Sequence, residues 1–306
     1  MNTTSNIAPE FDRPATPASF LSPTRPFYWS VQRELWEFRS IYLAPVIVAA
    51  VFLFGFIINL FRLPARMRVL DPMKQQELIQ QPYTFAAGAI MAATFLVAIF
   101  YCLEALYGER RDRSILFWKS LPVSDLTAVL SKASVPLVIL PLLTFMIIVV
   151  TQLVMVLLSS MVLLGSGQSA AALWSHLSLS MMWMMLLYHL VAIHALWFAP
   201  FYGWMLLVSS WARRAPLLWA TVPLLAIFVV EKVAFNTSYL PALLGYRLGS
   251  SPEGIPFSDG NLTMSHAMHI LSPWKFLLSP GLWFGLFITA GFLFAAARIR
   301  RSRGPM

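Results

Sequence analysis

Long apolar runs separated by short polar segments dominate the pattern of hydrophobic and polar positions along the chain. A helix needs about 20 apolar residues to cross a hydrocarbon core of about 30 Å. Six runs are long enough, so we predict an all-α polytopic membrane protein with six transmembrane helices. The predicted spans cover residues 41–60, 85–106, 134–164, 177–211, 216–235 and 281–297.

Two of the predicted spans are longer than a bilayer requires, and both contain prolines. Pro136 and Pro141 are expected to bend the first turns of the third span, because proline removes a backbone donor and clashes with the preceding turn. Pro200 and Gly203 predict a kink in the second half of the fourth span. Pro82 is expected to open the second span.

The segments outside the spans divide the chain further. Residues 1–24 are polar and proline-rich, and they are expected to form a disordered cytoplasmic tail without a signal peptide. Residues 25–40 mix aromatic and charged side chains, which predicts an N-terminal amphipathic helix in the membrane interface. Residues 41–303 form the six-span transmembrane domain. Within it, residues 236–280 predict re-entrant helices before the sixth span, and a plain surface loop is the alternative.

Composition and charge narrow the class of protein. Hydrophobic residues make up 58% of the chain and charged residues 11%, which leaves too few polar side chains to cover a water-soluble globule. The formal net charge is +9, but the basic residues gather at the ends of apolar runs, where cytoplasmic loops and anionic headgroups favour them. Membrane lipids are therefore the expected partners of this charge, and nucleic acid is excluded.

The distribution of lysine and arginine also predicts an orientation. More of these residues flank the side that carries both termini, so both termini are expected to be cytoplasmic. Residues 61–84 are an exception, because this outer loop is also basic. We expect an integral protein of a bacterial inner membrane. The single cysteine, Cys102, excludes an intramolecular disulfide.

A charged segment interrupts the apolar pattern between the second and third spans. Large apolar side chains in it fall on one side of a short helix. Pro122 ends that helix, and Ser124 is expected to cap the next. We interpret the segment as a docking element, with an ordinary basic loop as the alternative. The candidate docking residues are Glu109, Arg110, Arg111, Asp112, Arg113, Ser114, Phe117, Trp118 and Leu121.

Four short runs in this region are similar to a known family. They are Glu109-Arg110, Ser114-Ile115, Ser120-Leu121-Pro122-Val123-Ser124 and Leu130-Ser131-Lys132. Their order and spacing resemble the loop between the second and third spans of ABC-2 type permeases, the membrane subunits of ATP-driven exporters. This chain departs from the family at Arg113 and Ser131, where glycine is common. The resemblance covers about residues 25–303.

The resemblance implies a function and partners. Residues 109–121 would be the coupling helix, seated on a separate nucleotide-binding ATPase subunit that binds ATP and Mg. A second permease subunit, a homodimer partner, would complete the pathway. The chain has no Gly-x-x-x-x-Gly-Lys-Ser/Thr motif, so it is not expected to be an enzyme or to hold a cofactor itself.

Specific roles follow from this resemblance. The aromatic rings of Phe117 and Trp118 would fill an apolar pocket of the ATPase, in the manner of interface anchors. Arg110, Arg111 and Arg113 would pair with an acidic rim around that pocket.

A few polar residues lie inside the predicted spans. Gln152 in the third span and His189 and His194 in the fourth are candidate pathway residues, with interhelical hydrogen bonding as the alternative. The two histidines are five residues apart, which is a poor spacing for one metal ion. His266 and His269 have no neighbouring cysteine or acid in sequence, so no metal site is predicted.

Two other functional classes are alternatives. An ion-gradient-driven secondary transporter would need buried acidic residues or an internal repeat, and the sequence offers neither clearly. A polytopic membrane enzyme would need a cluster of catalytic residues at one membrane depth, whereas the histidines here are dispersed.

Overall fold

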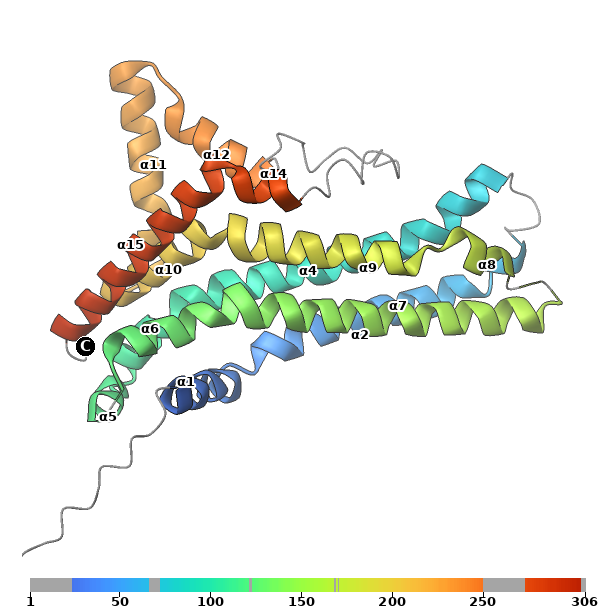
Figure 1. The fold of residues 1–306 in the computed structure, drawn as a ribbon, viewed down its shortest axis with the longest axis horizontal. Coiled ribbons are helices and arrows are strands. Elements are labelled where there is room, and N and C mark those ends of the chain that lie inside the picture. Colours follow the sequence, from blue (N-terminus) through green and yellow to red (C-terminus); the bar gives the residue numbers. More distant parts are fainter. Residues whose placement is uncertain are drawn as a thin grey trace, which may run out of the picture.

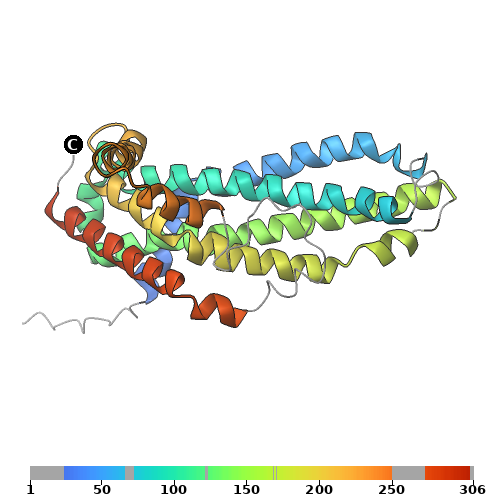
Figure 2. The same ribbon diagram turned by 90° about the horizontal axis from the view of Figure 1, so that it is seen from above.

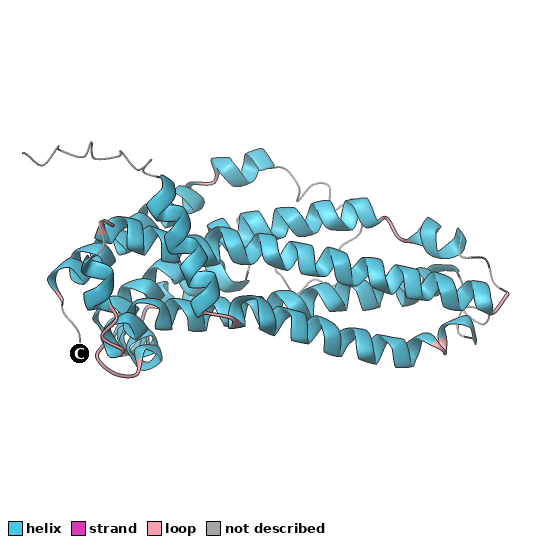
Figure 3. Ribbon diagram, turned by 90° about the horizontal axis from the view of Figure 1, so that it is seen from below, coloured by secondary structure: helices cyan, strands magenta, loops and turns pink. Residues whose placement is uncertain are grey.

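All regular secondary structure in the described part of the chain is helical (Figure 3). The computed structural model describes residues 24–65, 72–120, 123–167, 169, 171–249 and 273–303. Six helices in these ranges are long and apolar enough to cross a membrane, which confirms the predicted class. They are Ser40–Leu60, Lys74–Arg111, Asp125–Gly165, Leu179–Trp197, Pro216–Phe235 and Pro280–Ser302.

Within the described ranges, most consecutive helices are joined by connections of a few residues. Prolines stand in the first turn of several of them, where a missing N–H group costs nothing. In chain order the elements are α1 (Thr24–Glu37), α2 (Ser40–Leu60), α4 (Pro72–Arg111), α5 (Ile115–Ser120), α6 (Asp125–Ser134), η1 (Val135–Ile139), α7 (Leu140–Gly165), α8 (Ala171–His176), α9 (Leu179–Tyr188), η2 (His189–Trp197), α10 (Ala199–Trp211), α11 (Pro216–Phe235), α12 (Tyr239–Gly249), α14 (Pro273–Leu278) and α15 (Pro280–Ser302).

The long helices form an elongated bundle. Helices α2, α4, α7 and α9 run side by side along the longest axis of the molecule (Figure 1, Figure 2). At one end of the bundle α10 and α15 pack against each other, and α1 lies across that end, where it is seen nearly along its own axis in Figure 1. We call this the α5 end, because α5 and the C-terminal end of α15 also lie there.

Helix α11 differs from the rest. It leaves the bundle at a steep angle (Figure 1), and just 6% of its apolar window is buried inside the chain. Two short helices, α12 and α14, lie in the segment between α11 and α15. The stretch between those two short helices lies outside the described residues, as do residues 1–23 of the predicted tail.

Prolines explain the irregular turns, as predicted. The π-helix η1 lies where Pro136 and Pro141 interrupt the third span, because a wider turn accommodates the missing donors. In the fourth span a second π-helix ends at Trp197, and Pro200 stands in the first turn of α10. This confirms an interruption near Pro200 and divides the predicted span 177–211 into two helical parts.

The second span begins earlier than predicted. Helix α4 starts at Pro72 and contains Pro82 in its interior, so Pro82 does not open it. Lys74, Gln75, Gln76 and Glu77 have high helix propensity, which extends the helix through part of the predicted polar loop. The proposed bounds of the span were too short because hydropathy marks apolar positions and not helix ends.

Close packing of α10 on α15 depends on a glycine. A Cβ atom at Gly203 would lie 3.3 Å from Cγ2 of Thr289 and 3.4 Å from the Cβ of Phe292. Small residues at such crossings let two backbones approach. Beside this crossing lies a large apolar cluster that includes Trp197, Tyr202 and Leu206, each at most 2% exposed. The same crossing joins the α5 end to the sixth candidate span.

Gly203→Leu is therefore expected to lower the free energy of unfolding by about 1–3 kcal/mol, the typical cost of forcing extra volume into a packed core. Gly291→Leu is the matched control, since a Cβ there meets nothing within 4 Å. Thermal and denaturant unfolding of the purified protein in detergent would measure both. Equal stability of the two variants would contradict the packing described.

Candidate functional site

The predicted docking segment forms a short helix after a tight turn. Helix α4 ends at Arg111, and the N–H of Asp112 donates to the carbonyl of Gly108 at 2.9 Å. Arg113 then adopts a left-handed backbone with φ of 59°, and α5 begins at Ile115. Leu121 lies outside the described residues. The turn thus sets α5 directly between the second and third candidate spans.

One face of α5 is exposed and the other is buried. Leu116 is 58% and Phe117 60% exposed, whereas Ile115 is 1% exposed. Trp118 lies on the inward side: the guanidinium carbon of Arg33 sits 3.8 Å from its ring centroid. Of the two predicted aromatic anchors, Phe117 is exposed, whereas the ring of Trp118 is partly buried against Arg33 of α1.

Arg111, Asp112 and Arg113 are exposed beside Phe117, as a docking surface requires. Arg111 contacts the carboxylates of Glu104 at 2.8 Å and Asp112 at 3.0 Å. Ser114 is partly buried, and its hydroxyl donates to the carbonyl of Glu109 at 3.4 Å. The charged side chains of Arg111, Asp112 and Arg113 therefore remain accessible to a partner next to α5.

Arg110 does not belong to that surface. It is 2% exposed, and its Nη2 donates to the carbonyls of Ser209, at 3.0 Å, and Ala212. The Ser209 hydroxyl in turn accepts from the backbone N–H of Tyr107 at 2.9 Å. The prediction that Arg110 pairs with an acidic partner is wrong, because its donors fix the end of α4 to the C-terminal turn of α10.

Glu109 is also internal, with 3% of its surface exposed, and its carboxylate connects α4 to three other helices. Its Oε1 lies 2.7 Å from Nη2 of Arg33 and 3.2 Å from Nζ of Lys132, while its Oε2 lies 3.2 Å from Nη2 of Arg300. Those cations belong to α1, α6 and α15. The prediction of Glu109 as a docking residue is corrected accordingly: its carboxylate is fully engaged inside the chain.

Glu34 is a second internal acid, at 1% exposed. Its carboxylate contacts Lys132 at 2.9 Å and Arg33 at 2.7 Å, and it accepts the hydroxyl of Tyr101 at 2.9 Å. Asp125 at the start of α6 pairs with Arg300. We call the whole set the charge network. Its members are Arg33, Glu34, Glu109, Asp125, Lys132 and Arg300.

The charge network is balanced, with three acids and three cations. Burying a charge is costly unless opposite charges and hydrogen bonds compensate it. In α1, burial lowers the pKa of Arg33, but the carboxylates of Glu34 and Glu109 outweigh this effect and raise that pKa above its ordinary value. The network therefore holds its charges in place at the α5 end.

Glu37 stands at the rim of the charge network, where its side chain is 45% exposed. Its Oε2 lies 3.3 Å from Nε of Arg33. Burial raises the pKa of Glu37 above the usual range, and attraction to Lys132 and Arg33 offsets part of this rise. Glu37 is thus a more loosely held counter-ion than the buried acids.

Sequence reasoning missed Glu34 and Lys132 as site residues. Each is 1% exposed, although both side chains are charged. The available signal was a charged residue on the apolar flank of a predicted helix, which normally indicates a partner charge elsewhere in the chain. Glu34 and Lys132 lie 98 positions apart, so no local pattern identifies this pair.

Of the candidate pathway residues, Gln152 makes hydrogen bonds to two other helices. The amide nitrogen of Gln152 donates to the carbonyl of Tyr83 at 3.2 Å, and its oxygen accepts from Nε1 of Trp183 at 2.8 Å. The rings of His189 and His194 lie 5.8 Å apart, and His194 also stacks near Phe95. No group of three metal-ligating side chains occurs in the described ranges, and the predicted pair at 266 and 269 lies outside them.

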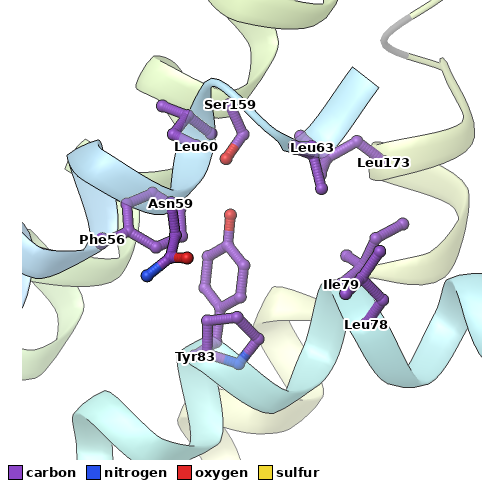
Figure 4. Close-up of a pocket in the computed structure, with 10 residues that line it drawn as sticks. Phe56, Asn59, Leu60, Leu63, Leu78, Ile79, Tyr83, Ser159 and Leu173 are labelled. Carbon is purple, nitrogen blue, oxygen red and sulfur yellow. The ribbon is translucent and has the colours of Figure 1, made fainter. Parts of the chain in front are cut away.

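A small cavity lies at the other end of the bundle, between α2, α4, α7 and α8. Figure 4 shows the hydroxyl of Tyr83 pointing between Leu60 and Ser159, with Asn59 at the side. The cavity measures about 70 Å³. Ligand pockets usually measure about 300–1,000 Å³, so this space is too small for a substrate site of that kind.

Comparison with protein-family models, with curated protein sequences and with solved structures found no match for this chain.

Lys132→Met is expected to lower the free energy of unfolding by about 3–5 kcal/mol, because it removes the buried cation that the carboxylates of Glu34 and Glu109 share. Lys119→Met is the control: Lys119 is exposed and its Nζ contacts backbone carbonyls of α15. Adding Glu34→Gln to Lys132→Met should restore part of the loss. Unfolding in detergent measures all three, and a harmless Lys132→Met would refute the network.

Arg113→Gly is expected to raise the free energy of unfolding by up to about 1 kcal/mol, because glycine adopts the left-handed region without steric cost. Asp112→Gly should give no gain, since Asp112 has a negative φ. The same unfolding measurement compares them. A stabilising Asp112→Gly together with a neutral Arg113→Gly would count against the turn described.

Proposed function

We propose that this chain is the transmembrane permease subunit of an ATP-driven exporter of the ABC-2 type. The observation that carries the proposal is the placement of α5. It lies between two candidate membrane spans, exposes Leu116 and Phe117, and is attached through its buried face to the charge network. A surface with this placement can receive a force from outside the membrane and pass it to the spans.

The exposed face of α5 has the composition of a docking site. An apolar centre of Leu116 and Phe117 is bordered by Arg111, Asp112 and Arg113. Interfaces commonly place an aromatic anchor in the middle and charges at the rim, where the charges guide association. The partner would be a nucleotide-binding ATPase with an apolar groove and an acidic rim. Trp118 supports this face from inside.

The charge network supplies the mechanical connection. Glu109 at the end of α4 holds Arg33 of α1, Lys132 of α6 and Arg300 of α15. Separating any of these helices would expose a buried charge to a low-dielectric surface, which is unfavourable. A displacement of α5 would therefore move the second, third and sixth candidate spans together with α1, and it would not be absorbed by local bending.

The backbone at Arg113 supports the resemblance to ABC-2 permeases, although the residue type differs from the family. Arg113 occupies a position where ABC-2 permeases often have glycine, and its φ of 59° lies in the region that glycine favours.

ATP would be bound and hydrolysed by the partner. The chain has no Gly-x-x-x-x-Gly-Lys-Ser/Thr motif, so ATP and Mg belong to the ATPase in this proposal and the permease itself is not an enzyme. The α5 end would then face the cytoplasm of a bacterial cell, together with both termini. Helix α1 would lie in the interface as an amphipathic helix, and α12 and α14 would be re-entrant helices.

A second copy of the chain would complete the pathway. Helices α2 and α11 have 17% and 6% of their apolar windows buried within the chain, which leaves large apolar faces to be covered. Lipid covers part of such surfaces, and packing of two protomers covers the rest. The proposal is a homodimer of permeases with two ATPase subunits beneath it.

Phe117→Ala is expected to reduce recovery of the ATPase partner at least about tenfold, because a central aromatic anchor typically contributes 2 kcal/mol or more to binding. The measurement is purification of the tagged chain from native membranes in mild detergent, followed by an ATPase assay of the recovered complex. Phe235→Ala is the control, since Phe235 is 71% exposed at the end of α11. It should not change the recovery.

Two outcomes of this experiment would contradict the proposal. One is a wild-type preparation that transports substrate without any associated ATPase. The other is normal recovery of the ATPase with Phe117→Ala but loss with Phe235→Ala, which would place the docking surface elsewhere.

A further inference from the structure

A pocket opens beside the charge network, between α1 on one side and α5, α6 and α15 on the other. Its volume is about 260 Å³. Two guanidinium groups and two indole rings dominate the wall, and small residues leave the space open. The lining includes Trp29, Ser30, Arg33, Trp118, Ala128 and Arg300.

The two arginines retain capacity to donate. Arg300 is 4% exposed, and its buried Nε has no hydrogen-bond partner among the described residues. The side chain of Arg33 is 20% exposed, and its Nε faces the rim residue Glu37 at 3.3 Å. A buried guanidinium donor without an acceptor is unfavourable, so an acceptor in this pocket would relieve a real cost.

The charges around the pocket determine what can enter. Glu34 and Glu109 are buried and paired behind the arginines, and Asp125 pairs with Arg300, so a neutral network lies at the back of the pocket. Glu37 pairs with Nε of Arg33 at 3.3 Å and is the more loosely held counter-ion of that arginine. An incoming anion would compete with Glu37 for Arg33.

The walls favour a phosphate at a membrane surface. Arginine forks match the geometry of phosphate oxygens and bind them with paired hydrogen bonds. Tyr28, Trp29 and Trp36 of α1 are 60–67% exposed next to the pocket. Exposed aromatic side chains of this kind are typical of the headgroup level of a bilayer. A volume of 260 Å³ suits a headgroup but not acyl chains, which would remain in the membrane.

We propose that this pocket binds the phosphate of an anionic phospholipid headgroup, held between Arg33 and Arg300 and flanked by Trp29 and Trp118. Glu37 is the counter-ion that the lipid displaces. The site lies where α1, α6 and α15 meet, so an occupied pocket adds a further bond between the helices of the charge network. This inference does not depend on the ATPase partner and holds for any membrane function of the chain.

The test measures lipid binding by the full-length protein in mild detergent, using native mass spectrometry. The probes are phosphatidylglycerol, phosphatidylcholine and inorganic phosphate. Phosphatidylglycerol is expected to bind at least about tenfold more tightly than phosphatidylcholine, which corresponds to about one charge-assisted hydrogen bond. Inorganic phosphate, which has no acyl chains, should bind far more weakly. Equal binding of phosphatidylcholine would overturn the proposal, and equal binding of inorganic phosphate would overturn the lipid assignment.

Substitutions that change the volume of the pocket but not its charges test the site directly. Ala128→Phe fills the pocket without removing a charge and should weaken phosphatidylglycerol binding at least about tenfold. Leu130→Phe is the matched control, because Leu130 is 41% exposed on the same helix and does not line the pocket. It should bind like the wild type. Undiminished binding by a folded Ala128→Phe protein would overturn the site.

A gain of binding provides an independent readout if Ala128→Phe fails to fold. Glu37→Gln removes the competing carboxylate at the rim and should tighten phosphatidylglycerol binding severalfold, with little change for phosphatidylcholine. Weaker binding by Glu37→Gln would contradict the displacement described, because it would show that the carboxylate assists the lipid.

Discussion

Six charges at one end of the bundle, four of them buried and two partly buried, constrain the rest of the structure. Glu34, Glu109 and Asp125 balance Arg33, Lys132 and Arg300, and the six side chains come from four helices that are far apart in sequence. A charge that loses its partner in such surroundings becomes strongly unfavourable. The charge network therefore helps to fix the relative positions of α1, α4, α6 and α15, together with the apolar cluster that these helices share.

This constraint gives the neighbouring features their roles. Helix α5 is too short to be stable alone, and it is held by the buried side chain of Ile115 and by the stacking of Trp118 under Arg33. Its outer face consequently remains available for a partner. The pocket beside Arg33 and Arg300 arises from the same arrangement, because two arginines that serve the network also border open space. Docking, coupling and lipid binding would thus share one set of contacts.

The sequence predicted the fold class and the approximate spans, since long apolar runs and prolines act locally. It also predicted a short helix after Glu109. It did not predict that Glu109 and Arg110 point inward, because charge alone does not tell which side of a helix faces the core. That answer depends on Arg33, Arg300 and the carbonyl of Ser209, which lie 76, 191 and 99 positions away. The start of α4 was missed for a local reason. Its first residues are polar helix formers, and these carry no hydropathy signal.

The most direct test of the central claim is a double-mutant cycle between Glu109→Gln and Arg300→Gln, measured by unfolding of the purified protein in detergent. Residues in one buried network interact by about 0.5–3 kcal/mol beyond the sum of their separate effects, so a coupling energy above about 1 kcal/mol is expected. Additive effects of the two substitutions would contradict the account, because the end of α4 would then not be tied to α15 by this pair.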